Sequence, residues 1–272
     1  MKIGYASDLH VKLNTTYYNV SEQDIINKLN LDSIDLLILG GDTCEYPHNL
    51  EFCSKLMKLY PNLKIIEVAG NHLYYSCTDK WLTMSEINNI CREFSNTYPN
   101  YRFLENESFI IDNVKFIGST MWTKLGERAG YQMKIQSSLN DFRYILNDKY
   151  DKITCSDIVK LHEKSIKYIT KEINNCEAEK CIVVTHHAPF FEYYSDISHA
   201  FGIDLTTKLR RLKKMPNYWI YGHTHINRNK ILMFNKGIIQ CLCNQMGYEG
   251  ESQWSDKFNA WQTYSPDSLI II

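Results

Sequence analysis

Five short motifs of aspartate, asparagine and histidine are the part of this 272-residue sequence best suited to chemistry. Each motif stands at the end of a short apolar run, where a buried strand is expected to end. Ligands bind at the carboxyl ends of the strands in open α/β sheets, so the five motifs would meet in one crevice. In chain order they are Asp8-Leu9-His10, Gly41-Asp42, Gly70-Asn71-His72, His186-His187 and Gly222-His223-Thr224-His225.

The types and spacing of these donors indicate a metal site. In Asp8-x-His10 and His223-x-His225 one residue separates the two donors, so an extended backbone directs both to the same side. Asp42 has two carboxylate oxygens and can contact two ions at once. Nitrogen and oxygen donors without thiolate suit Mn²⁺, Fe or Zn²⁺ rather than a structural zinc site. Tight turns beside the donors are favoured by three glycines, Gly41, Gly70 and Gly222.

In this order the five motifs resemble the pattern of the calcineurin-like metallophosphoesterase family, from residue 8 to residue 225. The later segment Asn244-Gln245-Met246-Gly247-Tyr248 is similar to a turn that follows the last motif in that family. A single Gly-Asp arises by chance, but all five motifs in order are specific. The resemblance implies an α/β fold, a four-layer sandwich of two mixed β-sheets flanked by helices, in a single domain over residues 1–272.

The resemblance also implies a role for each residue. One divalent ion would be bound by Asp8, His10, Asp42 and His225, and a second by Asp42, Asn71, His186 and His223. His72 would lie beside the substrate as the catalytic acid or a phosphate ligand, and not on a metal. A hydroxide bridging the two ions would attack phosphorus, and His72 would protonate the leaving oxygen.

One position departs from the family pattern. Leu73 stands where the family usually has an acidic residue that orients the preceding histidine. A carboxylate partner steadies an imidazole and raises its basicity, so another acid such as Asp79 or Asp196 would have to act in its place. His187 is expected to form a wall of the site, because adjacent residues on a strand point in opposite directions.

Charge arithmetic for such a site is compatible with phosphate binding. Two divalent ions bring four positive charges, of which Asp8, Asp42 and a bridging hydroxide remove three. The remaining ligands are neutral, so the site would stay cationic and attract a phosphate.

The elements that must position these motifs can be read from the hydrophobic pattern. Strands are predicted at residues 2–7, 34–39, 63–69, 181–185 and 218–221, and helices at 21–30, 50–59, 85–98 and 156–173. This alternation predicts parallel strands with helices packed outside them. Hairpins are predicted at 108–119 and 231–241, around Asp112-Asn113 and Asn235-Lys236. Residues 122–151 lack a clear period and are interpreted as a loop-and-helix lid.

Several other residues allow two interpretations. Arg143 could contact a phosphate in two places or form a structural ion pair, and His199 is a candidate substrate contact. His48 and His162 are interpreted as surface histidines. The basic run 208–214 could bind nucleic acid, but leucines at 205, 209 and 212 favour the solvent-exposed face of an amphipathic helix.

Composition limits the partners. The formal net charge is -1, which does not favour a large nucleic-acid surface, and no apolar run has the length of a membrane span. Nine scattered cysteines without a Cys-x-x-Cys pair, and an N-terminus without an apolar signal segment, predict reduced thiols and a cytoplasmic protein.

Together these features predict a metal-dependent hydrolase of a small or nucleotide-like phosphodiester. A phosphomonoesterase acting on small molecules or phosphoproteins, and a catalytically silent metal-binding scaffold, are the alternatives.

Overall fold

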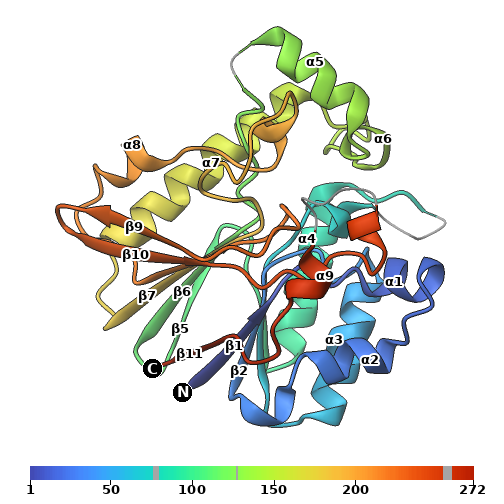
Figure 1. Ribbon diagram of the computed structural model, residues 1–272, viewed down its shortest axis with the longest axis vertical. Coiled ribbons are helices and arrows are strands. Elements are labelled where there is room, and N and C mark those ends of the chain that lie inside the picture. The colour runs from blue at the N-terminus through green and yellow to red at the C-terminus, as the bar shows by residue number, and fades with distance from the viewer. Residues whose placement is uncertain (76–79, 127, 254–258) are drawn as a thin grey trace.

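The computed structural model describes residues 1–75, 80–126, 128–253 and 259–272, and its strands form two sheets (Figure 1). The first sheet has the order β11-β1-β2-β3-β4. Its parallel strands are β1 (Lys2–Ala6), β2 (Leu36–Leu39), β3 (Lys64–Glu67) and β4 (Tyr101–Phe103). At one edge β11 (Leu269–Ile271) pairs with β1 in the antiparallel direction. The predicted strands in the first third of the chain are therefore confirmed.

The second sheet is mixed and has the order β5-β6-β7-β8-β10-β9. Its strands are β5 (Glu107–Ile111), β6 (Val114–Ser119), β7 (Lys180–Thr185), β8 (Tyr218–Ile220), β9 (Lys230–Phe234) and β10 (Gly237–Leu242). The strands β6, β7, β8 and β10 run parallel, while the pairs β5–β6 and β9–β10 at the two edges are antiparallel. Both predicted hairpins are thus confirmed.

Alternation along the strands explains why the two sheets pack face to face. Ile3 and Tyr5 of β1 and Ile38 of β2 lie in one buried group together with Phe116 of β6 and Val184 of β7. The side chains between them in sequence point to the other face of the first sheet, because successive residues of a strand alternate. Each sheet is therefore hydrophobic on both faces.

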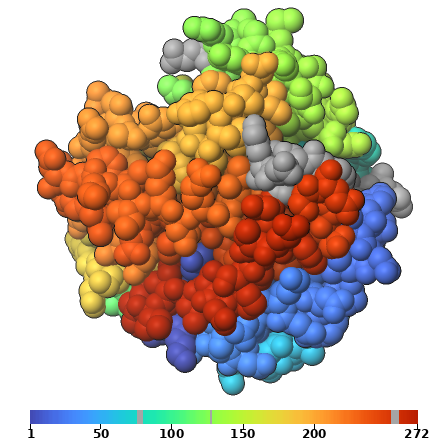
Figure 2. All heavy atoms as spheres, in the orientation of Figure 1, coloured from blue at the N-terminus to red at the C-terminus, as the bar shows by residue number. Residues whose placement is uncertain are grey.

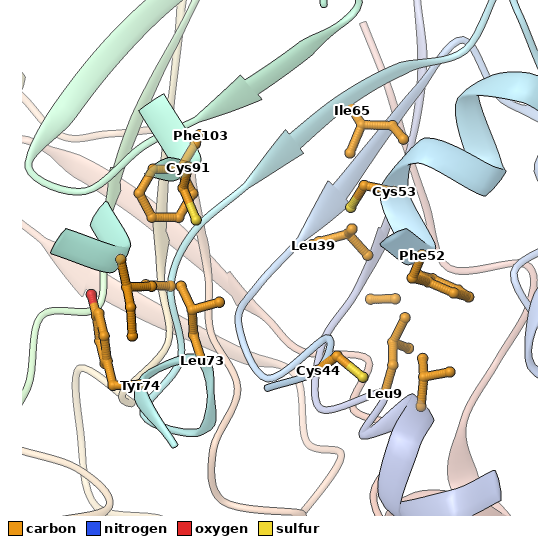
Figure 3. Close-up of a cluster of buried hydrophobic side chains, with 14 of the residues drawn as sticks. Leu9, Leu39, Cys44, Phe52, Cys53, Ile65, Leu73, Tyr74, Cys91 and Phe103 are labelled. Atoms are coloured by element: carbon orange, nitrogen blue, oxygen red, sulfur yellow. The ribbon is translucent and has the colours of Figure 1, made fainter. Parts of the chain in front are cut away.

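Helices cover the two outer faces and complete a four-layer sandwich. The helices α2 (Glu22–Lys28), α3 (His48–Leu59) and α4 (Met84–Thr97) pack on the first sheet, and α7 (Cys155–Asn174) packs on the second. Figure 3 shows part of the first helix–sheet core, where Leu39 and Ile65 face Phe52 and Cys53 of α3. Serine or threonine caps with an acid three residues later begin α2, α4 and α7, as expected for stable helix starts.

The remaining elements are short. They are α1 (Val11–Tyr17), α5 (Ala129–Ser138), α6 (Asp141–Tyr144), α8 (Thr206–Leu209), α9 (Ala260–Thr263) and the 3₁₀ turns Leu31–Ser33, His72–Tyr74, Ser198–Ala200 and Glu251–Gln253. The segment predicted as a lid, 122–151, contains α5 and α6, and α5 projects beyond the sheets in Figure 1.

The helix predicted for the basic run 208–214 is mostly wrong. It ends at Leu209, since the backbone N–H groups of Arg211 and Leu212 bond three residues back instead of four, and that of Lys213 donates to Asn174 Oδ1 at 2.7 Å. The leucine stripe itself is buried as expected. None of the helices in the described ranges has the length and hydropathy needed to span a membrane. Of the described cysteines, Cys53, Cys91, Cys155, Cys176, Cys181, Cys241 and Cys243 are free thiols, and Cys77 lies outside the described residues.

Candidate metal centre

The five motifs converge at one end of the two sheets. Asp8 and His10 follow β1, Asp42 follows β2, Asn71 and His72 follow β3, His186 follows β7, and His223 and His225 follow β8. All except His72 are at least nine-tenths buried. The His72 side chain remains 17% exposed, which makes it the member of the set most open to a substrate.

Left-handed backbone at these motifs differs from the extended backbone that the sequence interpretation assumed. The φ angles are +54° at Asp8, +42° at His10, +52° at Asp42, +68° at His223 and +52° at His225. The difference arises because β1 ends at Ala6 and β8 at Ile220, so the motifs lie in the loops beyond the strands. Non-glycine residues adopt this conformation at an energetic cost, and such residues concentrate at functional sites.

Two of the predicted glycines are required by close contact rather than by a tight turn. A Cβ atom on Gly70 would overlap Oδ1 of Asp42, and one on Gly222 would lie only 2.5 Å from Oδ2 of Asp8. Any larger residue would displace a carboxylate that the site needs. Gly41, with φ of +93°, does have the turn conformation that was expected.

Asp8, His10 and His225 form the first group of potential metal donors. The Nε2 atoms of His10 and His225 are 3.1 Å apart, and Nε2 of His225 is 3.4 Å from Oδ1 of Asp8. Nε2 of His10 is also 3.9 Å from Oδ2 of Asp42. These four residues are the set that the resemblance assigned to one ion.

A second group contains Asp42, His186 and His223. Nε2 of His186 is 3.2 Å from Oδ2 of Asp42 and 3.1 Å from Oδ1 of Asn71. Oδ1 of Asp42 accepts the backbone N–H of His72 at 2.9 Å, and Oδ2 is the Asp42 oxygen near both His10 and His186. Oδ2 is therefore positioned to be shared by two ions.

The chemistry of these atoms fits divalent ions. Ligand atoms bonded at about 2.1 Å with angles of about 90–110° lie about 3.0–3.4 Å apart, as several of these donor pairs do. Nε2 of His223 is buried without a hydrogen-bond partner among the described residues. Burial, together with the neighbouring His72, holds the pKa of His10 well below the ordinary value. Burial and the neighbouring His187 do the same to the pKa of His223. Both rings are therefore in the neutral form that binds metals.

Partners on the far side of the rings orient two of these histidines. Nδ1 of His186 donates to the carbonyl of Gly40 at 3.0 Å, and Nδ1 of His225 faces Glu251 at 2.7 Å. Each contact directs the other ring nitrogen, Nε2, into the site, which is the usual arrangement around metal-binding histidines. Burial lowers the pKa of His225, but Asp8 and Glu251 outweigh burial and raise it to about 10.

A carboxylate does orient His72, and it comes from Glu45. Oε1 of Glu45 is 3.4 Å from Nδ1 of His72. Leu73 instead packs in the core between the first sheet and its helices, where Figure 3 labels it. Of the two acids suggested by the sequence, Asp79 lies outside the described residues, and Asp196 pairs with Lys134 on the surface.

The electrostatic environment of His72 favours its protonated form. Burial lowers the pKa of this ring, but the carboxylates of Asp42, Glu45 and Asp141 outweigh burial and raise it above the ordinary value. His72 also lies within reach of His10 and Asp42 as a third potential donor group. The geometry therefore admits His72 either as a proton donor or as a ligand.

Asn71 is held by a residue from the segment predicted as a lid. Oδ1 of Asp141, in α6, accepts the Asn71 side-chain N–H at 2.8 Å, which turns the Asn71 oxygen towards His186. The Tyr75 hydroxyl donates to the same Asp141 oxygen. Arg143, two residues after Asp141, is exposed and bonds to Asn140 and Ser137, so Asp141 and not Arg143 contacts the proposed metal ligands.

Comparison with known proteins settles the family. A model of the calcineurin-like phosphoesterases matches residues 1–227. The chain belongs to this family. Uncharacterized protein L509 of Acanthamoeba polyphaga mimivirus is 30% identical to it, over 98% of this chain and 97% of that protein. A dimetal phosphatase from Danio rerio, LOC 393393, shares the fold with a TM-score of 0.54 at 11% identity, over 91% of this chain and 87% of that one.

Family membership makes the protein a metallophosphoesterase, an enzyme that hydrolyses phosphoric esters with two metal ions. The predictions of fold and family are thereby confirmed. The residues described above are this phosphoesterase's candidate metal-binding residues.

Aromatic rings enclose the centre of this phosphoesterase. Tyr248 lies against His10, with ring centroids 4.5 Å apart, and Phe201 stacks on His223 at 4.9 Å. The C-terminal part of the chain, coloured red in Figure 2, crosses the face of the molecule that this view shows. His187 forms a wall beside His223, at 4.3 Å, and its Nδ1 bonds to the carbonyl of Thr120.

Sequence reasoning missed Glu45, Asp141, Tyr248 and Glu251 as functional residues. Glu45 follows Asp42 by three residues, and Asp141 lies two residues before Arg143, the residue that was considered as a phosphate contact. Glu251 had no sequence signal, because only the packing of the C-terminal segment brings it to His225.

Three other histidines that the sequence analysis considered lie outside the metal centre. The ring of His199 lies between Tyr131 and Phe191, and its contact with substrate stays a prediction. The interpretation of His162 as a surface residue is wrong, since only 1% of it is exposed in α7. His48 is partly exposed and pairs with Glu51 on the surface.

Proposed function

We propose that this phosphoesterase hydrolyses small phosphodiesters, including nucleotide-like ones, with Mn²⁺, Fe or Zn²⁺ as its ions. The single observation that carries the proposal is the charge of the site. Beyond Asp8 and Asp42, it contains the carboxylates of Glu45, Asp141 and Glu251, each within hydrogen-bond distance of a histidine or of Asn71.

This charge favours a diester over a monoester. Two divalent ions and protonated His72 bring five positive charges against five formal carboxylates, so the site is less cationic than the sequence arithmetic indicated. Within the described ranges, no lysine or arginine side chain pairs with the eight site residues. A diester carries one negative charge, whereas a monoester at neutral pH carries close to two, so this environment penalises a diester less.

We assign the ions to the two donor groups. Asp8, His10, Asp42 and His225 would bind one, and Asp42, Asn71, His186 and His223 the other, with Oδ2 of Asp42 shared. When bound, such a pair supplies Lewis acidity and lowers the pKa of a water molecule, so that hydroxide is available at neutral pH.

The residues of the chain then divide the remaining work. Glu251 and the Gly40 carbonyl hold the imidazoles of His225 and His186 in position, and Asp141 holds the amide of Asn71. His72, protonated and oriented by Glu45, donates its proton to the oxygen that leaves phosphorus. The aromatic rings of Tyr248 and Phe201 restrict water around the site.

The buried position of the donors supports a small substrate. Seven of the eight site residues are at least nine-tenths buried, so little of the donor set other than His72 is accessible to a substrate. A small phosphate ester can approach so restricted a set of donors more easily than a phosphoprotein or a duplex can.

Relative rates on two chromogenic esters test the proposal. The kcat/KM for bis-p-nitrophenyl phosphate and for p-nitrophenyl phosphate should be compared with Mn²⁺, Fe²⁺ or Zn²⁺ present, beside the Asp42→Asn variant. We expect kcat/KM to be clearly higher for the diester than for the monoester. The Asp42→Asn variant should lose this hydrolysis of the diester. A preference for the monoester would identify a phosphomonoesterase, and metal binding without activity on either ester would identify a silent scaffold. Cyclic nucleotides, dinucleotides and sugar phosphates then define the substrate.

A further inference from the structure

A second cavity, of about 470 Å³, lies between α7 and the chain around α8, which Figure 1 shows beside each other. None of the eight residues of the metal centre lines it. Its volume falls in the range of sites that bind small molecules, roughly 300–1,000 Å³. The cavity is therefore large enough for a nucleotide-sized ligand.

Positive charge dominates the lining. Lys124, Lys167, Lys208 and Arg211 border the cavity, and Glu163 is the single acid among its lining residues. The net formal charge of these five is +3, four cations less one anion. Within the described residues none of the four basic side chains has an ion pair. Cations held together without partners repel one another, so an anion placed between them is stabilised.

One of the residues that line this basic cavity is a buried histidine. His162 is only 1% exposed, and its Nδ1 is 3.2 Å from the carbonyl oxygens of both Met121 and Trp122. Two carbonyls can only accept, so Nδ1 must carry the proton. Burial lowers the pKa of His162, so the ring is neutral and Nε2 is a bare acceptor.

Nε2 of His162 has no hydrogen-bond partner in the part of the chain that the structure describes. A buried acceptor left without a donor costs free energy, of about 1–3 kcal/mol in typical cases. A ligand in the cavity that offers a hydroxyl or amino hydrogen would remove this cost. Buried Ile166 and Leu212 provide an apolar wall for the rest of such a ligand.

From these features we propose that the cavity is a second ligand site for a small molecule with two or more phosphate groups and a hydroxyl or amino donor. A nucleoside diphosphate has this chemistry. The phosphates contact the four basic side chains, and the donor group reaches Nε2 of His162. The site is separate from the metal centre and does not depend on which ester the enzyme hydrolyses.

Calorimetry on the metal-loaded enzyme tests the proposal with adenosine 5′-(α,β-methylene)diphosphate as the probe. We expect one binding event that bis-p-nitrophenyl phosphate does not compete away. Arg211→Glu should weaken this event by about tenfold or more, because it removes one charge-assisted contact and adds repulsion. Arg210→Glu is the matched control, since Arg210 is exposed and adjacent but does not line the cavity.

His162→Asn tests the contribution of the buried imidazole. The asparagine amide can still donate to the two carbonyls, but it places no acceptor where Nε2 was, so binding of the probe should weaken several-fold.

Hydrolysis of bis-p-nitrophenyl phosphate by the Arg211→Glu variant should remain at the wild-type rate. If His162→Asn fails to fold, Arg211→Glu at the surface still decides the question.

Three results would overturn the proposal. The first is that all probe binding is competitive with bis-p-nitrophenyl phosphate. The second is equal weakening by Arg210→Glu and Arg211→Glu, which would mean a diffuse basic surface. The third is that a single-stranded oligonucleotide binds through Arg211 more tightly than the probe, which would make the surface a nucleic-acid site.

Discussion

The side chain that follows His72 packs into the hydrophobic core, and the carboxylate that faces the His72 ring comes from a different loop. Leu73 is 3% exposed, so an acid at this position would be buried among apolar groups at high cost. Glu45 lies at the edge of the same core and reaches Nδ1 of His72 from there. Glu45, and not the residue that follows His72 in the sequence, therefore orients the His72 ring.

Replacement of Glu45 by glutamine should impair proton donation to poor leaving groups. Loss of a partner that orients an imidazole typically costs about 10–100-fold. We expect wild-type rates on aryl phosphodiesters to depend weakly on the pKa of the leaving group, and rates of Glu45→Gln to depend on it steeply. The control is Glu51→Gln, at an exposed glutamate beside His48. A dependence of equal slope in Glu45→Gln and wild type would remove Glu45 from this role.

Replacement of His72 by alanine should separate proton donation from metal binding. Because His72 is proposed as the acid, His72→Ala should retain two ions per chain and lose about 10²–10⁴-fold in rate on alkyl diesters. Elemental analysis of the purified variant measures the ions directly. Loss of one ion would show instead that His72 belongs to the third donor group, with His10 and Asp42.

Asp42 is the residue whose change should affect both ions. Its Oδ2 faces His10 and His186, so Asp42→Asn removes a shared anionic donor. We expect a loss of about 100-fold or more in kcat and a reduced metal content, with the fold retained by circular dichroism. Activity within a few-fold of wild type at saturating metal would contradict the shared role.

At the scale of elements, the short helix α6 joins the segment 122–151 to the metal centre. Asp141 is 3% exposed and accepts hydrogen bonds from Asn71 and Tyr75, so the position of α6 fixes the orientation of one proposed ligand. A carboxylate cannot donate, which forces the Asn71 amide to present its nitrogen to Asp141 and its oxygen to His186.

Asp141→Ala should weaken one ion selectively. Without the acceptor the Asn71 amide is free to rotate, and we expect the affinity for the ion bound by Asn71 to fall about 10–100-fold while the other ion remains. Competition with a metal-sensitive dye measures both affinities. Asp141→Asn keeps an acceptor and should restore most of the affinity, and Asp148→Ala, exposed on the same segment, is the control. Equal loss of both ions would mean a general disturbance of the fold.

At the scale of the whole molecule, the metal centre joins the two sheets at one end of the sandwich. Asp8, His10, Asp42 and Asn71 extend from the first sheet, and His186, His223 and His225 from the second. Ions bound between them would cross-link the two halves of the fold. Ligand binding of this kind stabilises the native state by mass action.

Chelation should therefore lower the melting temperature. Each ion at about 1,000 times its dissociation constant contributes about 4 kcal/mol, which corresponds to a decrease of about 10 °C for a domain of this size. Differential scanning fluorimetry before and after EDTA treatment, with re-addition of Mn²⁺ or Zn²⁺, measures the effect. The Asp42→Asn variant should show a much smaller decrease. An unchanged melting temperature in the wild-type enzyme would mean that no ion links the sheets.

The sequence alone determined the local structure and the chemical type of the site. The hydrophobic pattern located β1, β2, β3, β7 and β8 within two residues or so, because burial on both faces requires continuous apolar runs, but it missed the three-residue strands β4 and β11. The polar motifs stood at the strand ends, and their types and order were specific enough to indicate the family. Hairpins were predictable from Asp112-Asn113 and Asn235-Lys236, since turn geometry is a local property.

Only the tertiary structure decided which groups support the site. Glu251 reaches His225 from 26 residues away, and Asp141 reaches Asn71 across 70, contacts that no local pattern encodes. The same holds for Lys213, whose backbone N–H bonds to Asn174 just beyond the end of a helix that the leucine spacing predicted to be longer. Periodicity reports which face of an element is buried. The partner that a buried polar atom finds depends instead on how distant segments pack together.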